Sequence, residues 1–181
     1  MQNHHQILIK KLTQLFFIFL SCLALTQCGF HLRGEQMVPP QMHLLYLESP
    51  NPYDPFIVQL RNRLKSMKVE MTSMPQQAPL ILQILNVAFT QRLTSMSANT
   101  QVRTFVISYD VSFQLVNARG QVIYGPIIVA SSISYSTSDT QLLGDAQQLD
   151  LKKKHMLQDI IMKIFNHINS EKGRQALQQV I

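Results

Sequence analysis

The two cysteines are the residues of this chain best suited to covalent chemistry. Cys22 and Cys28 lie near the N-terminus, and a thiolate is a strong nucleophile and metal ligand. Two cysteines cannot form a disulfide-dense scaffold. The histidines are scattered, and His155 and His167 are too far apart on one expected helix to share a metal, so no His/Cys zinc set exists. A thiol can also be alkylated at its sulfur to form a thioether.

An apolar run explains why a thiol would stand at this position. Lys10 and Lys11 precede an apolar stretch that extends from Leu12 to Leu25, and no acidic residue occurs before Glu35. A basic segment followed by a short apolar one is typical of a secretory signal. The stretch is shorter than the ~20 residues that a membrane-spanning helix needs, so a signal anchor is the weaker alternative.

The sequence Leu25-Thr26-Gln27-Cys28 closes this stretch and has the pattern of a bacterial lipobox. We therefore predict that residues 1–27 are a lipoprotein signal peptide and that Cys28 carries an S-diacylglycerol group and an N-acyl chain. Several acyl chains anchor a protein durably to a membrane, and Gly29, which is not Asp, permits sorting to the outer membrane. Cys22 is a competing lipidation site, and both cysteines could instead be plain apolar residues of the leader.

The rest of the chain alternates between strand and helix patterns. Residues 28–41 have no sustained periodicity and predict a lipid-anchored tether. Asp54 and Pro55 suit the cap and first position of a helix. Expected strands are Met42–Glu48, Leu80–Phe89, Gln101–Asn117 and Gln121–Tyr135, and expected helices are 55–67 and one that begins after a loop ending at Asp145 and runs to about residue 168.

The strand expected at 101–117 has one apolar face and one polar face. Its odd positions from Phe105 to Leu115 are apolar or aromatic, whereas its even positions are mostly Thr, Ser, Asp and Gln. This alternation predicts that one face packs on a core and the other meets water or a polar partner. Gly120 suits a hairpin turn, and Pro126 places the following strand at an edge or at a bulge.

These elements predict an α+β fold in the order β-α-β-β-β-α. We expect a two-layer sandwich in which two helices cover one face of a four-stranded, mostly antiparallel sheet, because two amphipathic helices need one apolar sheet face. The expected domain covers residues 42–170, and residues 171–181 are expected to be a polar C-terminal tail. Lys152, Lys153 and Lys154 lie near the expected start of the last helix, where cations oppose the helix dipole, and this suggests a partner.

Nothing in the sequence has the spacing of a catalytic or cofactor site. Gly-x-Ser-x-Gly, His-Glu-x-x-His, Cys-x-x-Cys and phosphate-binding loops are absent, and the acidic residues form no pair that suggests catalysis. The chain is therefore expected to be no enzyme, with no metal and no cofactor beyond its lipid. Its formal net charge is +6 with 14% charged residues, and its basic residues do not alternate with aromatic ones, so nucleic-acid binding is unsupported.

The segment Cys28-Gly29-Phe30-His31-Leu32-Arg33 resembles the start of the mature chain in the family of the LPS-assembly lipoprotein LptE, also called RlpB. The resemblance continues in the order of that family over nearly the whole mature chain. Its further pieces are Tyr109–Leu115, the turn at Gly120, Leu142-Leu143-Gly144 and a C-terminal helix with Met156 and Asp159.

This resemblance implies an outer-membrane lipoprotein on the periplasmic side that forms a complex with the LptD β-barrel. It would act as a plug in the barrel lumen and as an assembly partner, and would help deliver lipopolysaccharide to the outer leaflet. Lipopolysaccharide is anionic, so exposed cations could pair with its phosphates. Arg92 and Arg103 flank the small polar segment 94–100 and are the candidate contacts. The alternative is a general envelope lipoprotein that binds lipid or peptidoglycan without a barrel partner.

Overall fold

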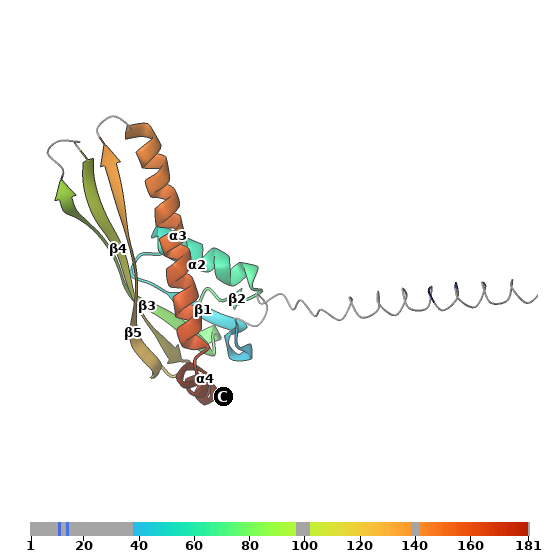
Figure 1. Ribbon diagram of the computed structural model, residues 1–181. Helices are drawn as coiled ribbons and strands as arrows, with labels where there is room; N and C mark the ends of the chain where they lie inside the picture. The colour runs from blue at the N-terminus through green and yellow to red at the C-terminus, as the bar shows by residue number, and fades with distance from the viewer. Residues whose placement is uncertain (1–10, 12–13, 15–37, 97–101, 139–141, 181) are drawn as a thin grey trace, which may run out of the picture. The chain divides into compact units, whose positions relative to one another are not determined.

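The computed structural model of the protein describes residues 11, 14, 38–96, 102–138 and 142–180 (Figure 1). Internal contacts divide the chain into two units, Met1–Arg33 and Gly34–Ile181, and the fold described here is that of the second. It has two layers, a single sheet and a layer of helices on one of its faces (Figure 1). The α+β class and the two-layer arrangement agree with the prediction.

The sheet has five strands in the spatial order β2-β1-β3-β4-β5. It is mixed and not mostly antiparallel as predicted, because β1 pairs in parallel with β2 and β3, and only β3, β4 and β5 form an antiparallel ribbon. The prediction of four strands was wrong by one, since a two-residue strand is too short to carry a periodic pattern. The strands are β1 (Leu44–Glu48), β2 (Glu70–Met71), β3 (Leu80–Met96), β4 (Val102–Asn117) and β5 (Val122–Ser138).

Three α-helices lie in the described part of the chain: α2 (Pro55–Ser66), α3 (Leu142–Ile168) and α4 (Glu171–Leu177). The start of α2 agrees with the prediction, because the Asp54 carboxylate accepts a 2.8 Å hydrogen bond from the N–H of Phe56 and Pro55 follows it. Helix α4 occupies the segment that was expected to be a polar tail. Ala176 and Leu177 are buried there, and two adjacent apolar residues are too few to predict a helix from sequence.

The core lies between the helices and one face of the sheet, which we call the inner face. Side chains from α2, α3 and the odd positions of β4 meet in one cluster, in which the largest fully buried residues are Phe56, Phe113 and Phe165. The apolar face predicted for the strand at 101–117 is therefore the inner face. The opposite face, which we call the open face, carries the even, mostly polar positions of β4.

Several elements extend further than predicted. Strand β3 continues past Phe89 to Met96, and β5 continues past Tyr135 to Ser138, because Thr and Ser fit the backbone ladder of an antiparallel ribbon. Helix α3 begins at Leu142, so the Lys152–Lys154 run lies beyond its first turn and does not oppose the helix dipole as was expected.

Two local predictions about the β4–β5 region agree with the structure. Gly120 has a φ of 78° in the hairpin turn between the two strands, a conformation that glycine adopts without strain. Pro126 lies in β5, which is an edge strand, close to an irregularity in its pairing with β4. The missing N–H of proline is tolerated at such a place.

Candidate functional site in the distal half of the sheet

The three long strands continue beyond α2 and form what we call the distal half of the sheet, which comprises residues 87–96, 102–111 and 129–138 (Figure 1). Helix α3 packs mainly on β5 and less on β4, so the inner face of β3 stays partly uncovered. Three apolar side chains follow one another on that strand, Phe89, Leu93 and Met96, and are 41%, 52% and 65% exposed. We call these three residues the distal strip.

Cationic side chains stand beside the distal strip. The Lys153 ammonium of α3 lies 5.0 Å from the centroid of the Phe89 ring, a cation–π contact that contributes about 0.5–1 kcal/mol at an exposed site. Arg103 is the pairing partner of Met96, and its position alternates with Phe105 and Ile107, so it belongs to the inner face. The distal strip therefore combines exposed apolar surface with positive charge.

Aromatic residues support this surface from β4 and β5. The rings of Phe89 and Tyr109 are 4.7 Å apart, and those of Phe105 and Tyr135 are stacked at 5.4 Å. The Gln91 side-chain amide donates a 2.8 Å hydrogen bond to the Tyr135 hydroxyl. Because Gln91 is on β3 and Tyr135 on β5, this bond spans the intervening strand and links the two sides of the ribbon.

The tyrosine hydroxyls in this region remain protonated well into the alkaline range. Burial raises the pKa of Tyr109 above its ordinary value of 10.0, and the negative charge of Asp54 raises it further. Burial also raises the pKa of Tyr135, although the hydrogen bond from Gln91 opposes this shift. Both hydroxyls are thus neutral hydrogen-bonding groups at physiological pH and supply no nucleophile or base.

The open face of the distal half has a different character. Along β5 its side chains are small, with Ala130, Ser132, Ser134 and Ser136 all exposed. The hydroxyls of Thr104 and Ser136 lie 3.0 Å apart across two strands. This face is flat, polar and poor in charge, apart from Asp110 and Arg92.

The two arginines proposed from sequence do not come together. Arg92 pairs with Val106 and belongs to the open face, whereas Arg103 pairs with Met96 and belongs to the inner face. They cannot hold one phosphate between them, because the sheet separates their side chains. Cys28, the predicted lipidation site, lies outside the described residues.

Sequence reasoning missed the residues that surround Arg103. Phe89 looked like the end of a buried strand, and Lys153 was noted only for its place in a helix. The sequence signal for this surface was the Lys152–Lys154 run beside a helical apolar stripe. It suggested a partner but did not indicate which surface the partner would contact. Pairing of Phe89 with Tyr109 depends on the β3–β4 register, and periodicity alone does not fix that register.

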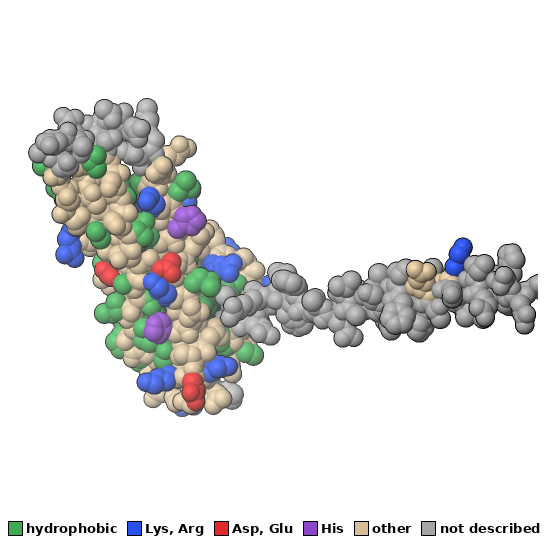
Figure 2. All heavy atoms as spheres, in the orientation of Figure 1, with side chains coloured by type: hydrophobic (Ala, Val, Ile, Leu, Met, Phe, Trp, Pro, Cys, Tyr) green, Lys and Arg blue, Asp and Glu red, His purple; other side chains and the backbone are tan. Residues whose placement is uncertain are grey.

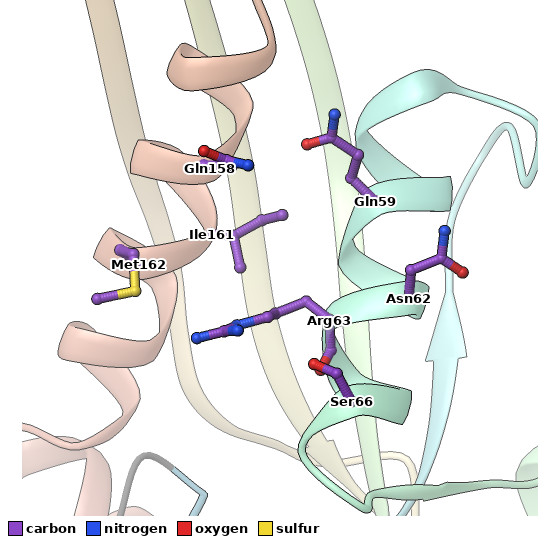
Figure 3. Close-up of a pocket in the computed structure, with 7 residues that line it drawn as sticks. All are labelled: Gln59, Asn62, Arg63, Ser66, Gln158, Ile161 and Met162. Carbon is purple, nitrogen blue, oxygen red and sulfur yellow. The ribbon is translucent and has the colours of Figure 1, made fainter. Parts of the chain in front are cut away.

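A groove lies between α2 and α3 (Figure 3). Its volume is about 520 Å³, and in the view of Figure 3 the Arg63 side chain reaches from α2 toward α3. The Gln59 amide oxygen is shielded from solvent and accepts no hydrogen bond. The groove is lined by Gln59, Asn62, Arg63, Ser66, Gln158, Ile161 and Met162.

The described residues contain no group of three or more His, Cys, Asp or Glu side chains that could hold a metal ion. Among these same residues, no helix combines the length and hydropathy needed to cross a bilayer. On the face drawn in Figure 2, the Lys and Arg side chains are dispersed among apolar and neutral polar ones and do not gather into one patch.

Comparison with known proteins agrees with this architecture. The chain is 20% identical to an uncharacterized lipoprotein B from Nitrosomonas europaea over 81% of this chain and 96% of that one, with a TM-score of 0.66. It is 17% identical to the rare lipoprotein B from Shewanella oneidensis over 73% and 98% of the two chains, with a TM-score of 0.60. At these identities the likeness establishes the fold alone.

The sequence relatives are more specific. The LPS-assembly lipoprotein LptE of Pectobacterium atrosepticum is 26% identical over 88% of both chains. That of Yersinia enterocolitica is 31% identical over 54% of this chain and 47% of its own length. A family model described as "LptE: Lipopolysaccharide-assembly" matches residues 42–168. Because this match spans most of the domain that builds the sheet and its helices, the chain belongs to the LptE lipopolysaccharide-assembly family.

Proposed function

We propose that this protein is an outer-membrane lipoprotein that forms a complex with an LptD-like β-barrel and helps deliver lipopolysaccharide to the outer leaflet. In this proposal it plugs the barrel lumen, assists assembly of the barrel, and makes or breaks no covalent bond. Membership of the LptE family supports a role in lipopolysaccharide assembly. The barrel partner comes from the family resemblance.

The structural observation that carries the proposal is the distal strip with its cations. Lipopolysaccharide has acyl chains and phosphate groups, so a surface that handles it needs exposed apolar area beside positive charge. Leu93 and Met96 supply the first, and Arg103 and Lys153 supply the second, all on the inner face of the distal half. Charge-assisted hydrogen bonds from Arg to phosphate are among the stronger polar contacts available to proteins.

The polar open face suits the second part of the proposal. A barrel lumen is polar, and a plug inside it needs hydrogen-bonding side chains in place of apolar ones. Exposed Ser132, Ser134 and Ser136 meet that requirement with little side-chain bulk. Asp110 and Arg92, on the same face, can bond polar groups of the lumen.

The decisive experiment is a purification from membranes. The chain, tagged at its C-terminus and extracted in mild detergent, should bring down a large β-barrel protein in near-stoichiometric amount, identified by mass spectrometry. Recovery of the lipoprotein alone would favour the alternative, a general envelope lipoprotein that binds lipid or peptidoglycan without a barrel partner.

The anchor is tested separately. Cys28→Ala should abolish incorporation of labelled palmitate, because no sulfur remains at the end of the lipobox to form the thioether. Cys22→Ala is the matched control and should leave labelling unchanged. Continued labelling of the Cys28→Ala chain would move the site to Cys22.

A further inference from the structure

Strand β5 has a free long edge. Among the described residues, it is the last strand of the sheet and pairs only with β4. The Lys163 ammonium of α3 donates a 2.7 Å hydrogen bond to the carbonyl of Ala130, so this carbonyl points away from β4. Since successive residues of a strand direct their backbone groups to alternate sides, Ser132, Ser134 and Ser136 also present their N–H and C=O groups to the outer edge.

The other side of the ribbon supports this assignment. The Thr94 hydroxyl of β3 donates a 3.1 Å hydrogen bond to the Thr104 carbonyl of β4. The backbone N–H and C=O groups at the even positions of β4 therefore point toward β3. The backbone groups at the odd positions of β4 then point toward those at the odd positions of β5, in agreement with the pairing of Phe105 with Tyr135. The outward direction of the even positions of β5 thus follows from two independent hydrogen bonds.

This edge lacks the usual protection against pairing. Exposed edge strands normally carry charged side chains, proline or a covering element, because a row of free N–H and C=O groups otherwise recruits another strand. From Val122 to Ser138 the chain has no Asp, Glu, Lys or Arg. Pro126 lies near the start of the strand, and within the described part of the chain Lys163 is the side chain that bonds an outward carbonyl of β5.

The side chains along the edge also leave room for a neighbour. On the open face the even positions from Ala130 to Ser136 are small and exposed, so they offer no steric barrier to an incoming strand. On the inner face Ile133 and Tyr135 are half-buried and offer apolar surface to alternate side chains of that strand. An extended, uncharged segment fits both faces.

We propose that the outer edge of β5, from Ser132 to Ser136, pairs with an extended, uncharged segment of the barrel partner, which adds a strand to this sheet. This inference rests on the proposed function. The absence of protective charge indicates a permanent partner, because a protein whose unprotected strand edge stays exposed to solvent is prone to aggregation. A closed barrel has no free strand edge of its own, so the pairing segment belongs to a loop or a terminal extension of the partner.

Hydrogen exchange at single-residue resolution tests this pairing. In the free protein, the amides of Ser132, Ser134 and Ser136 should exchange quickly, while those of Ile133 and Tyr135 are held by β4. In the purified complex with the barrel, the three serine amides should become protected. Strand addition should protect all three serine amides together, because each would donate a hydrogen bond to the added strand.

Ser134→Pro provides the matching variant. Proline removes one outward N–H and leaves the ladder to β4 intact, so the free protein should keep its fold and melting temperature within error. Its recovery with the barrel should fall by about tenfold, because the ring also blocks approach of the added strand. Ser134→Ala retains the N–H and is the control, and its recovery should match that of the wild type.

Each other outcome counts against the proposal. A complex that forms without new protection of the three amides would overturn it and leave the proposed function standing. Protection that appears in the free protein as its concentration rises would overturn it in favour of a second copy at the edge. Failure of the wild-type chain to form any barrel complex would remove the proposed function and this inference together.

Discussion

The two arginines on neighbouring strands have different surroundings although they flank the same segment of chain. Arg103 stands beside the exposed Met96 on the inner face, and Arg92 stands among small polar residues on the open face. A ligand that has both acyl chains and phosphates can satisfy its two parts only where apolar surface and a cation adjoin. The residue-scale prediction is that only one arginine contributes strongly.

Arg103→Glu should weaken binding of purified lipopolysaccharide by about tenfold or more, because a charge-assisted hydrogen bond is lost and a repulsive charge appears beside the phosphate. Arg92→Glu makes the same charge change on the opposite face and should have a much smaller effect. Binding is measured by surface plasmon resonance with wild type as reference. Equal affinity of the Arg103→Glu and wild-type chains would remove this residue from the binding surface.

At the scale of elements, the sequence predicts what depends on local pattern. The capped start of α2, the alternation of β4 and the Gly120 turn all follow from side chains a few positions apart. Strand β2 and helix α4 were missed because each is too short for a period to emerge, and they exist through tertiary contacts: β2 pairs with β1, and α4 buries Leu177. The distal strip was also missed because it depends on tertiary contacts: the exposure of its side chains is set by where α3 crosses the sheet.

Helix α4 packs so closely on the end of α3 that one of its positions has no room for a side chain. A Cβ on Gly173 would collide with the backbone carbonyl oxygens of His167 and Ile168, and backbone cannot move aside as a side chain does. Gly173→Ala should therefore lower the free energy of unfolding by about 1–3 kcal/mol, measured by urea denaturation. Gln175→Ala, at an exposed position of the same helix, should change it little. An equal free energy of unfolding for the two variants would mean that α4 moves to make room for the methyl group added at Gly173 without loss of stability.

An ion pair within α3 is sensitive to acid. The Asp159 carboxylate lies 2.8 Å from the Lys163 ammonium, and this hydrogen bond holds the pKa of Asp159 below its ordinary value of 3.8. A lowered pKa in the folded state stabilises the fold above the ordinary pKa, and the contribution disappears as the pH falls through the lowered value.

Asp159→Asn should accordingly lower the melting temperature slightly at pH 7, and the difference from wild type should vanish once the pH falls below the lowered pKa of Asp159. The effect is small because solvent screens the pair, whose Lys163 and Asp159 side chains are 42% and 46% exposed. Asp150→Asn, on the exposed side of the same helix, is the control. A deficit of the Asp159→Asn chain that persists unchanged in acid would show that the ion pair is not its source.

Buried apolar side chains are distributed unequally between the distal half of the sheet and the half that both α2 and α3 cover. The large buried side chains gather where α2 and α3 both cover the sheet, whereas residues 91–96 of β3 are all exposed. Burial of apolar area is the main source of stability, so the distal half is held mainly by its hydrogen-bonded ladder and by α3. We expect it to open more often than the rest.

Amide exchange of the free protein checks this expectation. Amides of Gln91–Met96 that take part in the ladder should exchange by local opening, at free energies well below that of global unfolding. Those of Leu82 and Ile84 should exchange only on global unfolding, because both side chains are fully buried. Equal protection along the whole of β3 would mean that the two halves unfold as one unit.

Helix α3 extends from the distal half of the sheet to the segment that precedes α4. Its 27 residues make a rod of about 40 Å, fixed at its far end where the Tyr124 hydroxyl donates to the His167 carbonyl. One helix therefore carries both the Lys153 ammonium, which lies over Phe89 of the distal strip, and the His167 carbonyl, which lies next to α4 in the chain.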